Sequence, residues 1–259
     1  MADQAAPVFI GGSPRSGTTL LLRLLGRHPQ VEAYYESKLL ASLIDWLEGT
    51  VFNPFDPISP FGFRAHEYFT RERIYRCAGL AMQQLYGGRA TDAGRSIWLE
   101  KTPRNSLHVD ALLELLPAAR FLHVVRDGRD VAVSMPSLEA APQDIVECAR
   151  LWAGYTEAGR SACRRHPDHC LEIRYEQLVR APQQALEPVC RFLGLDLQPD
   201  MLDLDSVKVS LFSEHWGESA PTTAPIARWR RHADFPREAF KAVAGDLLLE
   251  LGYESTSDW

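Results

Sequence analysis

A glycine-rich loop near the start of the chain constrains the fold more than any other feature. Residues 8–11 form a short apolar β-type run, and from Gly17 to about Arg27 leucines recur at helical spacing. Between them, residues 12–19 read G-S-P-R-S-G-T-T, the glycine spacing of a phosphate-binding loop. Glycine lets the backbone turn tightly around an anion, and the first amides of the next helix point toward that anion. The sequence therefore predicts a strand, an anion-binding loop and a helix.

The rest of the chain alternates β-type and helical patterns. Predicted strands cover residues 97–100, 120–125 and 170–174. Predicted helices cover residues 37–48, 67–86, 105–116, 144–165, 182–193 and 236–251, with another helix starting near residue 130. Gly87 and Gly88 are expected to end the helix over 67–86. This alternation predicts a three-layer α/β fold, with a mainly parallel central sheet between helices.

The length of 259 residues is consistent with one domain over residues 1–259. Within it, residues 49–95 are predicted to be a variable insertion, because their first part is rich in proline and phenylalanine. Residues 206–232 show little periodicity and are predicted to be a lid-like loop. The first residues lack the basic and apolar segments of a secretion signal, and no apolar run is long enough to span a membrane. We therefore expect a cytoplasmic location.

The net charge and the spacing of the cysteines argue against some classes of function. A formal net charge of −6 argues against a general nucleic-acid binder, which needs a basic face, although a local basic pocket remains compatible with it. Only four of the basic residues are lysines, so a lysine inside a motif is informative. The five cysteines lack metal-ligand spacing and indicate reduced thiols. No metal site is predicted.

The phosphate-binding loop lacks the lysine that nucleoside triphosphatases use. Thr18 stands in its place, and Arg15 within the loop could supply a cationic contact instead. A ligand with a less charged terminal group, such as a sulfonate, needs less compensation. Two alternatives remain open at this point. One is a divergent kinase using ATP and Mg²⁺, with Asp127 as the tempting metal ligand, and the other is a non-catalytic module that binds a bisphosphonucleotide.

Residues 9–20, F-I-G-G-S-P-R-S-G-T-T-L, resemble the 5′-phosphosulfate loop of sulfotransferases. These enzymes use 3′-phosphoadenosine 5′-phosphosulfate (PAPS) as donor. The resemblance is nearest to tyrosylprotein sulfotransferases and bacterial enzymes of the P-R-S-G-T-T type. It implies a P-loop-type fold and donor binding by a set of loop residues: Arg15, Ser16, Gly17, Thr18 and Thr19.

Two further motifs resemble the same family in the expected order. Residues 120–135 contain Arg126 and Ser134, eight residues apart, which match the family's 3′-phosphate site. Arginine suits this role because its planar guanidinium binds phosphate oxygens in bidentate fashion. Residues 98–105, W-L-E-K-T-P-R-N, place Lys101 where the family has a lysine that contacts the transferred sulfonate and the bridging oxygen.

Two weaker similarities complete the donor site that the resemblance implies. Residues 171–178, L-E-I-R-Y-E-Q-L, match a turn whose tyrosine lies near the nucleotide, which makes Tyr175 a candidate. Residues 226–231, I-A-R-W-R-R, resemble a loop that folds over the nucleotide. Arg228 aligns best with its basic residue, and Arg230 is a weaker choice.

Transfer to a hydroxyl or amine needs a group that accepts the proton. In the tyrosylprotein subfamily this base is a glutamate, and Glu36 within Y-Y-E-S-K matches it. In other sulfotransferases the base is a histidine, so His66 and His108 are alternatives without a motif. The chain departs from the subfamily at Leu138, where a further nucleotide-binding arginine is absent.

The resemblance implies an enzyme that moves a sulfuryl group from PAPS to an acceptor hydroxyl or amine and releases 3′,5′-adenosine bisphosphate without a metal. Glu36, Lys101 and Arg15 are the implied catalytic residues. Residues 49–95 are expected to lie on the acceptor side. Given the expected location, a small metabolite, lipid or natural product fits as acceptor better than a protein tyrosine. The oligomeric state is left open.

Overall fold

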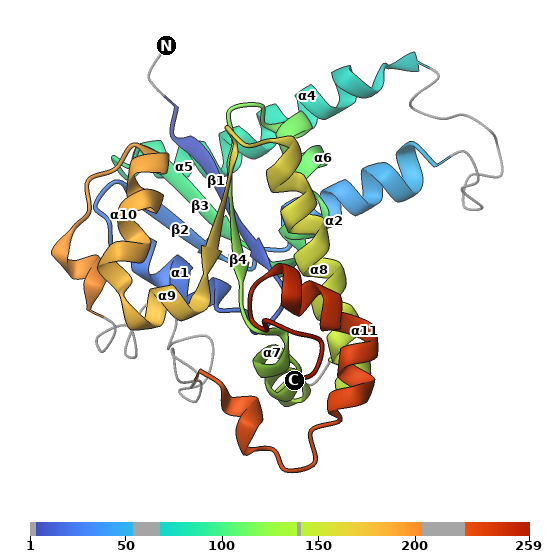
Figure 1. Ribbon diagram of the computed structural model, residues 1–259. Coiled ribbons are helices and arrows are strands. Elements are labelled where there is room, and N and C mark those ends of the chain that lie inside the picture. The colour runs from blue at the N-terminus through green and yellow to red at the C-terminus, as the bar shows by residue number, and fades with distance from the viewer. Residues whose placement is uncertain (1–3, 54–67, 139–140, 204–225) are drawn as a thin grey trace.

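A single parallel sheet organises the protein. The computed structural model describes residues 4–53, 68–138, 141–203 and 226–259. Five strands pair in the order β2-β3-β1-β4-β5, and all four pairings are parallel (Figure 1). The strands are β1 (Ala6–Gly12), β2 (Val31–Tyr35), β3 (Ile97–Lys101), β4 (Arg120–Val125) and β5 (Cys170–Arg174). The predicted α/β fold with a central parallel sheet is confirmed.

The register of the sheet brings the strand ends to one edge. Ile10 pairs with Lys101, which in turn pairs with Tyr35 at the end of β2. On the other side of β1, Val125 at the end of β4 pairs with Arg174 at the end of β5. Residues that directly follow the strands therefore meet along this edge, where α/β proteins bind their ligands.

Helices α1 (Thr18–Leu25), α9 (Tyr175–Arg180) and α10 (Pro182–Leu193) cover one face of the sheet (Figure 1). Because side chains alternate along a strand, Val8 and Ile10 of β1 point to this side. They pack with the leucines of α1 and with the buried side of α10.

Phe9 of β1 points to the opposite face and packs with a second layer of helices. These helices are α2 (Leu39–Trp46), α4 (Arg71–Met82), α5 (Gly88–Asp92), α6 (Val109–Leu115) and α8 (Ile145–Arg165). A third apolar cluster lies beyond the end of β4. It joins α7 (Gly128–Ser134), the first part of α8 and α11 (Arg237–Glu250). Burial of these faces accounts for the three-layer arrangement.

Short irregular turns connect the main elements. Wider, π-type turns cover Leu47–Val51 and Gln83–Gly87, and 3₁₀ turns cover Pro103–Leu107, Met135–Ser137, Pro199–Leu202 and Arg228–Arg231. The predicted helix over 105–116 therefore starts as a 3₁₀ turn. The predicted lid over 206–232 falls largely outside the described residues, and so do residues 54–67 of the predicted insertion over 49–95.

The expected helix break at Gly87 and Gly88 is wrong. Helical structure continues through both glycines from α4 into α5, with the π-type turn between them. Glycine only weakens a helix, and tertiary contacts outweigh this preference. Gln83 supplies such contacts, since its amide donates to the Ala5 carbonyl at 2.7 Å and its carbonyl accepts from Trp98 Nε1 at 3.1 Å.

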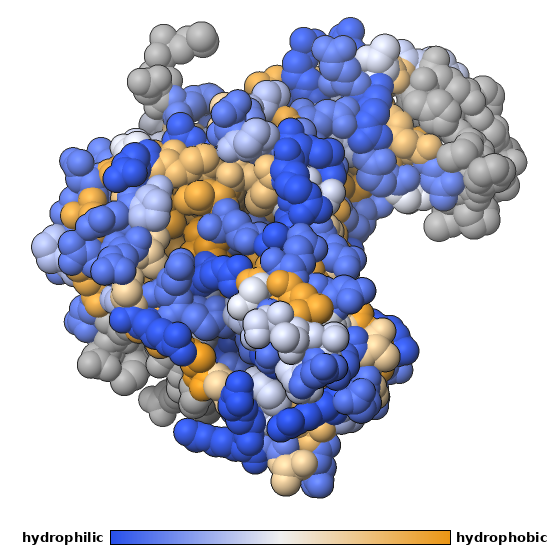
Figure 2. Space-filling model, in the orientation of Figure 1, coloured by the Kyte–Doolittle hydropathy of each residue, from blue (hydrophilic) through white to orange (hydrophobic). Residues whose placement is uncertain are grey.

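Hydrophilic side chains cover most of the face shown in Figure 2, and apolar side chains emerge in separate patches. Within the described residues, none of the helices combines the length and the apolar character needed to cross a bilayer.

The contact between α8 and β4 requires glycine at position 159. A Cβ atom there would lie 2.2 Å from the ring of His123, which is completely buried on β4. Gly154, on the same helix, has no atom within 4 Å of the equivalent position. We expect Gly159→Ala to lower the free energy of unfolding by about 1–3 kcal/mol, because a well-packed core resists added volume.

Gly154→Ala is the matched control, and urea unfolding is the measurement. The Gly154→Ala substitution should raise the free energy of unfolding by about 0.5–1 kcal/mol, because alanine has a higher helix propensity than glycine. Equal effects of both substitutions would contradict the described packing of α8.

Candidate active site

The candidate site residues lie at or just beyond the carboxyl ends of the strands. Lys101 is the last residue of β3, and Glu36 directly follows β2. Arg126 directly follows β4, and Tyr175 directly follows β5. The loop after β1 contains the glycine-rich motif. The parallel sheet therefore places all of these candidates on one edge, although they are far apart in sequence.

The loop between β1 and α1 is shaped to receive an anion. Arg15 and Gly17 have φ angles of 70° and 98°, so the backbone turns sharply before Thr18 begins the helix. Gly17 caps α1 without a side-chain hydrogen bond, which leaves the helix end available to a ligand. Gly17 also needs its hydrogen side chain, since a Cβ atom there would lie 2.2 Å from the Tyr175 ring. The buried Ser16 hydroxyl has no partner among the described residues.

Hydrogen bonds join this loop to the predicted 3′-phosphate motif. Arg15 Nε donates to Ser134 Oγ at 3.0 Å, and Arg126 Nη1 donates to the Arg15 carbonyl at 3.1 Å. The Arg126 guanidinium also lies 4.3 Å from the centre of the Tyr175 ring, a cation–π contact. Arg126 and Ser134 are each only 2% exposed. The structure thus brings four predicted donor-site residues into one cluster.

Positive charge converges on this cluster. Burial lowers the pKa of Arg15, and the nearby guanidinium groups of Arg126 and Arg228 lower it further. The positive charges of these neighbouring guanidinium groups repel one another. An anion bound among the guanidinium groups would offset that repulsion. The cluster is therefore suited to bind a phosphate or a sulfonate.

Asp130 fixes the segment that carries Arg228. Its buried carboxylate accepts hydrogen bonds from the backbone amides of Ala227 and Trp229, at 2.8 and 3.0 Å. One of its oxygens also lies 3.5 Å from Arg126 Nη2. Asp130 lies within the motif over residues 120–135. Its contacts to Ala227 and Trp229, about a hundred residues away, could not be predicted from the sequence. Arg230 is exposed and stacks on the Trp229 ring at 4.9 Å, whereas Arg228 is half-buried.

Lys101 and Glu36 form an ion pair, with 2.5 Å between Lys101 Nζ and Glu36 Oε1. Lys101 is fully buried, while the Glu36 side chain is 30% exposed. Burial lowers the pKa of Lys101, and Glu36 opposes this effect. The Tyr35 ring lies 3.9 Å from the ammonium nitrogen, and the Glu36 amide donates to the Lys101 carbonyl at 2.8 Å. A buried cation thus faces a carboxylate that solvent or a ligand can reach.

Glu100 is a buried carboxylate that the sequence did not identify as part of the site. It accepts hydrogen bonds from Thr102 Oγ1 at 2.7 Å, from Asn105 Nδ2 at 2.8 Å and from Ser37 Oγ at 3.2 Å. Burial raises the pKa of Glu100. Because Ser37 follows Glu36, this carboxylate ties the loop after β2 to the turn after β3. The sequence signal was a glutamate inside a strand, followed by hydroxyl and amide residues.

The alternative histidine bases occupy different settings. His66 lies outside the described residues. His108 Nε2 lies 3.3 Å from Asp45 Oδ1, and burial lowers the pKa of His108. Leu138 directly follows the 3₁₀ turn after α7 and donates its amide to the Met135 carbonyl.

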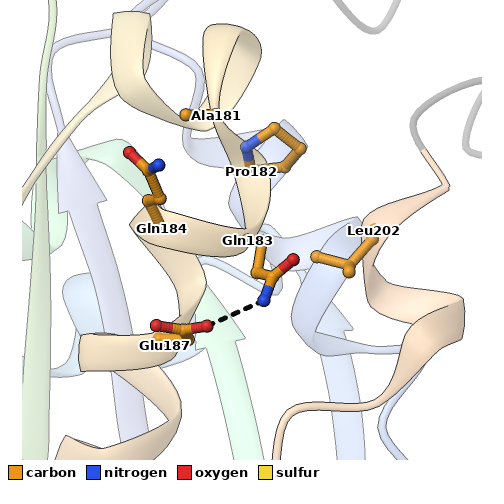
Figure 3. Close-up of a pocket in the computed structure, with 6 residues that line it drawn as sticks. All are labelled: Ala181, Pro182, Gln183, Gln184, Glu187 and Leu202. Carbon is orange, nitrogen blue, oxygen red and sulfur yellow. Dashed lines mark hydrogen bonds between the residues drawn. The ribbon is translucent and has the colours of Figure 1, made fainter.

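A surface hollow beside α10 has none of this chemistry (Figure 3). Gln183 donates to Glu187 along α10 at 2.9 Å, and no predicted site residue contributes to the lining of the hollow. Its lining residues are Ala181, Pro182, Gln183, Gln184, Glu187 and Leu202. Over the described ranges, no group of three or more His, Cys, Asp or Glu side chains is placed to hold a metal ion.

The fold and the loop define a class of α/β proteins with a phosphate-binding loop after the first strand. Comparison with known proteins identifies the family within this class. A model described as "Sulfotransferase family" matches residues 7–199, well over half of the chain. The chain therefore belongs to the sulfotransferase family, and it is a transferase enzyme.

Relatives and solved structures agree with this assignment. The chain is 27% identical to protein-tyrosine sulfotransferase 1 of Danio rerio, over 95% of this chain and 72% of that protein. The solved sulfotransferase domain from the curacin biosynthetic pathway is 19% identical and aligns with a TM-score of 0.61, over 98% of this chain and 99% of the domain. Mouse sulfotransferase SULT7A1, solved in complex with PAP, is 14% identical and aligns with a TM-score of 0.50, over 94% and 84% of the two chains.

The convergence of Arg15, Arg126 and Arg228 predicts stabilisation by a small polyanion. Pyrophosphate at ten times its dissociation constant should raise Tm by about 3–6 °C in the wild type. Arg15→Gln should remove most of this shift, because it deletes the central guanidinium of the cluster.

Arg73→Gln, at an exposed position on α4, is the matched control and should keep the shift. Thermal unfolding with and without pyrophosphate gives the result. An equal loss of the shift in both variants would show that pyrophosphate binds nonspecifically.

Proposed function

We propose that this single-domain protein transfers a sulfuryl group from PAPS to a hydroxyl or amine and releases 3′,5′-adenosine bisphosphate. One observation carries the proposal. A cluster of three arginines lies on the same edge of one parallel sheet as an ion pair between the buried Lys101 and the partly exposed Glu36. The first can hold a ligand with several anionic groups, and the second can perform acid–base and charge-stabilising chemistry beside it.

The residues present fit a donor of this kind. Arg126 and Ser134 would hold the 3′-phosphate, and Tyr175 would contact the nucleotide. The 5′ end would bind the amides and hydroxyls of residues 16–19, including the Ser16 hydroxyl, which is buried without a partner among the described residues. Arg228 would add a further cation, and Arg230, which is exposed, would contribute less. The mouse neighbour solved with PAP supports the same donor class.

The donor supplies an activated sulfuryl group, whose bond to the 5′-phosphate oxygen breaks as the bond to the acceptor atom forms. Glu36 accepts the proton of the acceptor hydroxyl or amine, because its carboxylate is partly exposed. Lys101 and Arg15 stabilise the negative charge that develops on the leaving phosphate. Arg126 and Ser134 hold the ligand in register, which aligns the reacting atoms. The ion pair with Glu36 also opposes the lowering of the Lys101 pKa that burial causes.

A kinase mechanism has less support from the site. Thr18 replaces the lysine that such enzymes direct at the outer phosphates. Asp127, the candidate metal ligand, caps α7 and accepts from Arg129 Nε at 3.0 Å and Nη2 at 2.8 Å. Its carboxylate is therefore already engaged by an arginine. A non-catalytic module would not need the Lys101–Glu36 pair.

We propose a small molecule with a hydroxyl or amine as the acceptor, and the cytoplasm as the location. The net charge of −6 disfavours a long polyanionic acceptor. The relatives include enzymes named for protein tyrosine and a domain named for a biosynthetic pathway, so their names alone do not decide the acceptor. An acceptor panel should therefore contain phenols, alcohols, amines and a tyrosine peptide.

The donor assignment predicts metal-independent binding of 3′,5′-adenosine bisphosphate. In calorimetric titration, Arg126→Ala should weaken this binding by about tenfold to a hundredfold, because charged hydrogen bonds to phosphate contribute about 1.5–3 kcal/mol. Ser134→Ala tests the same site with a smaller structural change.

Arg120→Ala is the matched control, because Arg120 begins the same strand at its opposite end. It should leave the affinity unchanged. Absence of bisphosphate binding, together with Mg²⁺-dependent binding of ATP, would overturn the sulfotransferase donor site and favour a kinase.

The catalytic assignment predicts loss of turnover with binding retained. Glu36→Gln should lower kcat by about a hundredfold or more, since it removes the proton acceptor. Lys101→Ala should lower kcat by about a hundredfold to a thousandfold, since it removes a preorganised charge. Transfer from ³⁵S-labelled PAPS to the acceptor panel measures turnover, and calorimetry measures bisphosphate binding.

Glu32→Gln is the control, because Glu32 lies on β2, the strand that precedes Glu36, and pairs only with Arg89, at 3.6 Å, among the ion pairs of the described residues. It should keep wild-type turnover. Near-normal turnover in both Glu36→Gln and Lys101→Ala, with bisphosphate binding intact, would refute these roles.

A further inference from the structure

We propose that Trp259 and Arg129 are positioning residues for the donor site. They hold the segment that carries Arg228, residues 226–231, against α7. This inference rests on the proposed function, because Arg228 matters only if the arginine cluster binds the donor. Arg129 lies within the motif over residues 120–135 but is given no role by it, and Trp259 lies outside the motifs that resemble the family.

The centre of this arrangement is the Arg129 guanidinium. It contacts two indole rings, 4.2 Å from the centre of the Trp229 ring and 4.6 Å from the centre of the Trp259 ring. Its nitrogens donate to Asp127 and to Glu254, and its side chain is 2% exposed. The planar guanidinium therefore links Trp229 to the last residues of the chain.

Trp259 also contacts Trp229 directly. Their ring centres are 6.0 Å apart in an edge-to-face arrangement. Trp259 packs in addition on Phe240 at 6.4 Å and lies under the ammonium group of Lys241 at 5.7 Å. Both residues belong to α11, which packs on α8. Trp259 thus connects Trp229 to a helix that is part of the core.

Trp229 connects the contacts of Trp259 and Arg129 to the segment that carries Arg228. Its amide, with that of Ala227, is held by the buried Asp130 carboxylate, which also lies close to Arg126. Arg228 stands between the two bonded residues. Its position is therefore set by two anchors, the carboxylate on α7 and the indole ring of Trp229.

The backbone beside Arg228 requires such anchors. Ala227 has a φ of 58°, a left-handed conformation that is unfavourable for a residue with a Cβ atom. Strain of this kind persists only where surrounding contacts hold it. Loss of Trp259 would remove one of the two rings in contact with Arg129 and the edge-to-face contact to Trp229. The segment would then relax, and Arg228 would move away from Arg15.

The test compares Trp259→Ala with Trp259→Phe, which keeps an aromatic ring. Arg129→Lys is a second variant, because it keeps the charge but loses the planar group. Trp46→Ala, at a 54% exposed tryptophan on α2, is the matched control. Hydrogen exchange at the Ala227 and Trp229 amides, without ligand, measures docking of the segment. Calorimetry with 3′,5′-adenosine bisphosphate and steady-state kinetics measure the consequence for the donor site.

We expect Trp259→Ala and Arg129→Lys to accelerate exchange at both amides. Bisphosphate affinity and KM for PAPS should worsen by about five- to thirtyfold, the size of one or two lost cation–π contacts, while kcat changes less. Trp259→Phe should restore most of both properties, and Trp46→Ala should match the wild type. A residue that only stabilises the fold would not give this split between KM and kcat.

Two results would overturn the inference. One is unchanged exchange at Ala227 and Trp229 in both Trp259→Ala and Arg129→Lys. The other is faster exchange with unchanged bisphosphate affinity, which would separate the packing from the donor site. If the wild type itself fails to bind the bisphosphate, the proposed function fails. That outcome is distinguishable, because it requires no variant.

Discussion

The parallel register of the sheet is the constraint on which the site depends. In a parallel sheet all strands end at the same edge, and here the pairs Ile10–Lys101 and Tyr35–Lys101 align three of those ends. Residues that lie up to about two hundred positions apart in the sequence thereby meet at one edge of the sheet. A shift of one residue in β3 would turn the buried Lys101 to the other face of the sheet, because side chains alternate along a strand. The register of the strand pairing therefore also fixes the chemistry of the site.

The site contains buried charged side chains, and carboxylate partners within the site offset the unfavourable free energy of burying them. Arg126 and Lys101 are almost completely buried, and burial of a charge is unfavourable unless it is paired. In this structure Asp130 lies beside Arg126, and Glu36 pairs with Lys101. Among the described residues, the non-glycine positions with positive φ are Arg15, Glu36, Lys38 and Ala227. All four lie in the segments that form the site, which is where backbone strain is expected to collect.

The sequence predicted those parts of the fold that depend on local patterns. The runs that became β1, β3, β4 and β5 are strongly apolar, and the glycine-rich loop identifies the helix after it. Strand β2 was missed, because only Val31 of its five residues is buried and V-E-A-Y-Y lacks a clear apolar alternation. The glycines at 87 and 88 were misjudged, because the contacts of Gln83 that accompany the continuous helix come from other elements.

In the candidate site too, residues within local sequence motifs could be predicted, whereas residues that act through tertiary contacts could not. Residues that belong to motifs at strand ends, such as Arg126 and Lys101, could be named from the sequence, because the motif and the strand are adjacent. Asp130 and Trp259 could not be assigned in this way. Each acts through partners on other elements, and Asp130 reaches the amide of a residue 99 positions away. Such contacts depend on tertiary packing, which leaves no local pattern.

Tyr35 shows that the two halves of the site are physically connected. Its ring covers the Lys101 ammonium group, and its hydroxyl is hydrogen-bonded to Thr19 at the start of α1. Burial raises the pKa of Tyr35, so the hydroxyl stays protonated and uncharged. Any movement of the phosphate-binding loop therefore changes the surroundings of the ion pair. A ligand that orders the loop through Thr19 would also fix the ring against which Lys101 rests. Tyr35 thus contacts both the phosphate-binding loop and the ion pair.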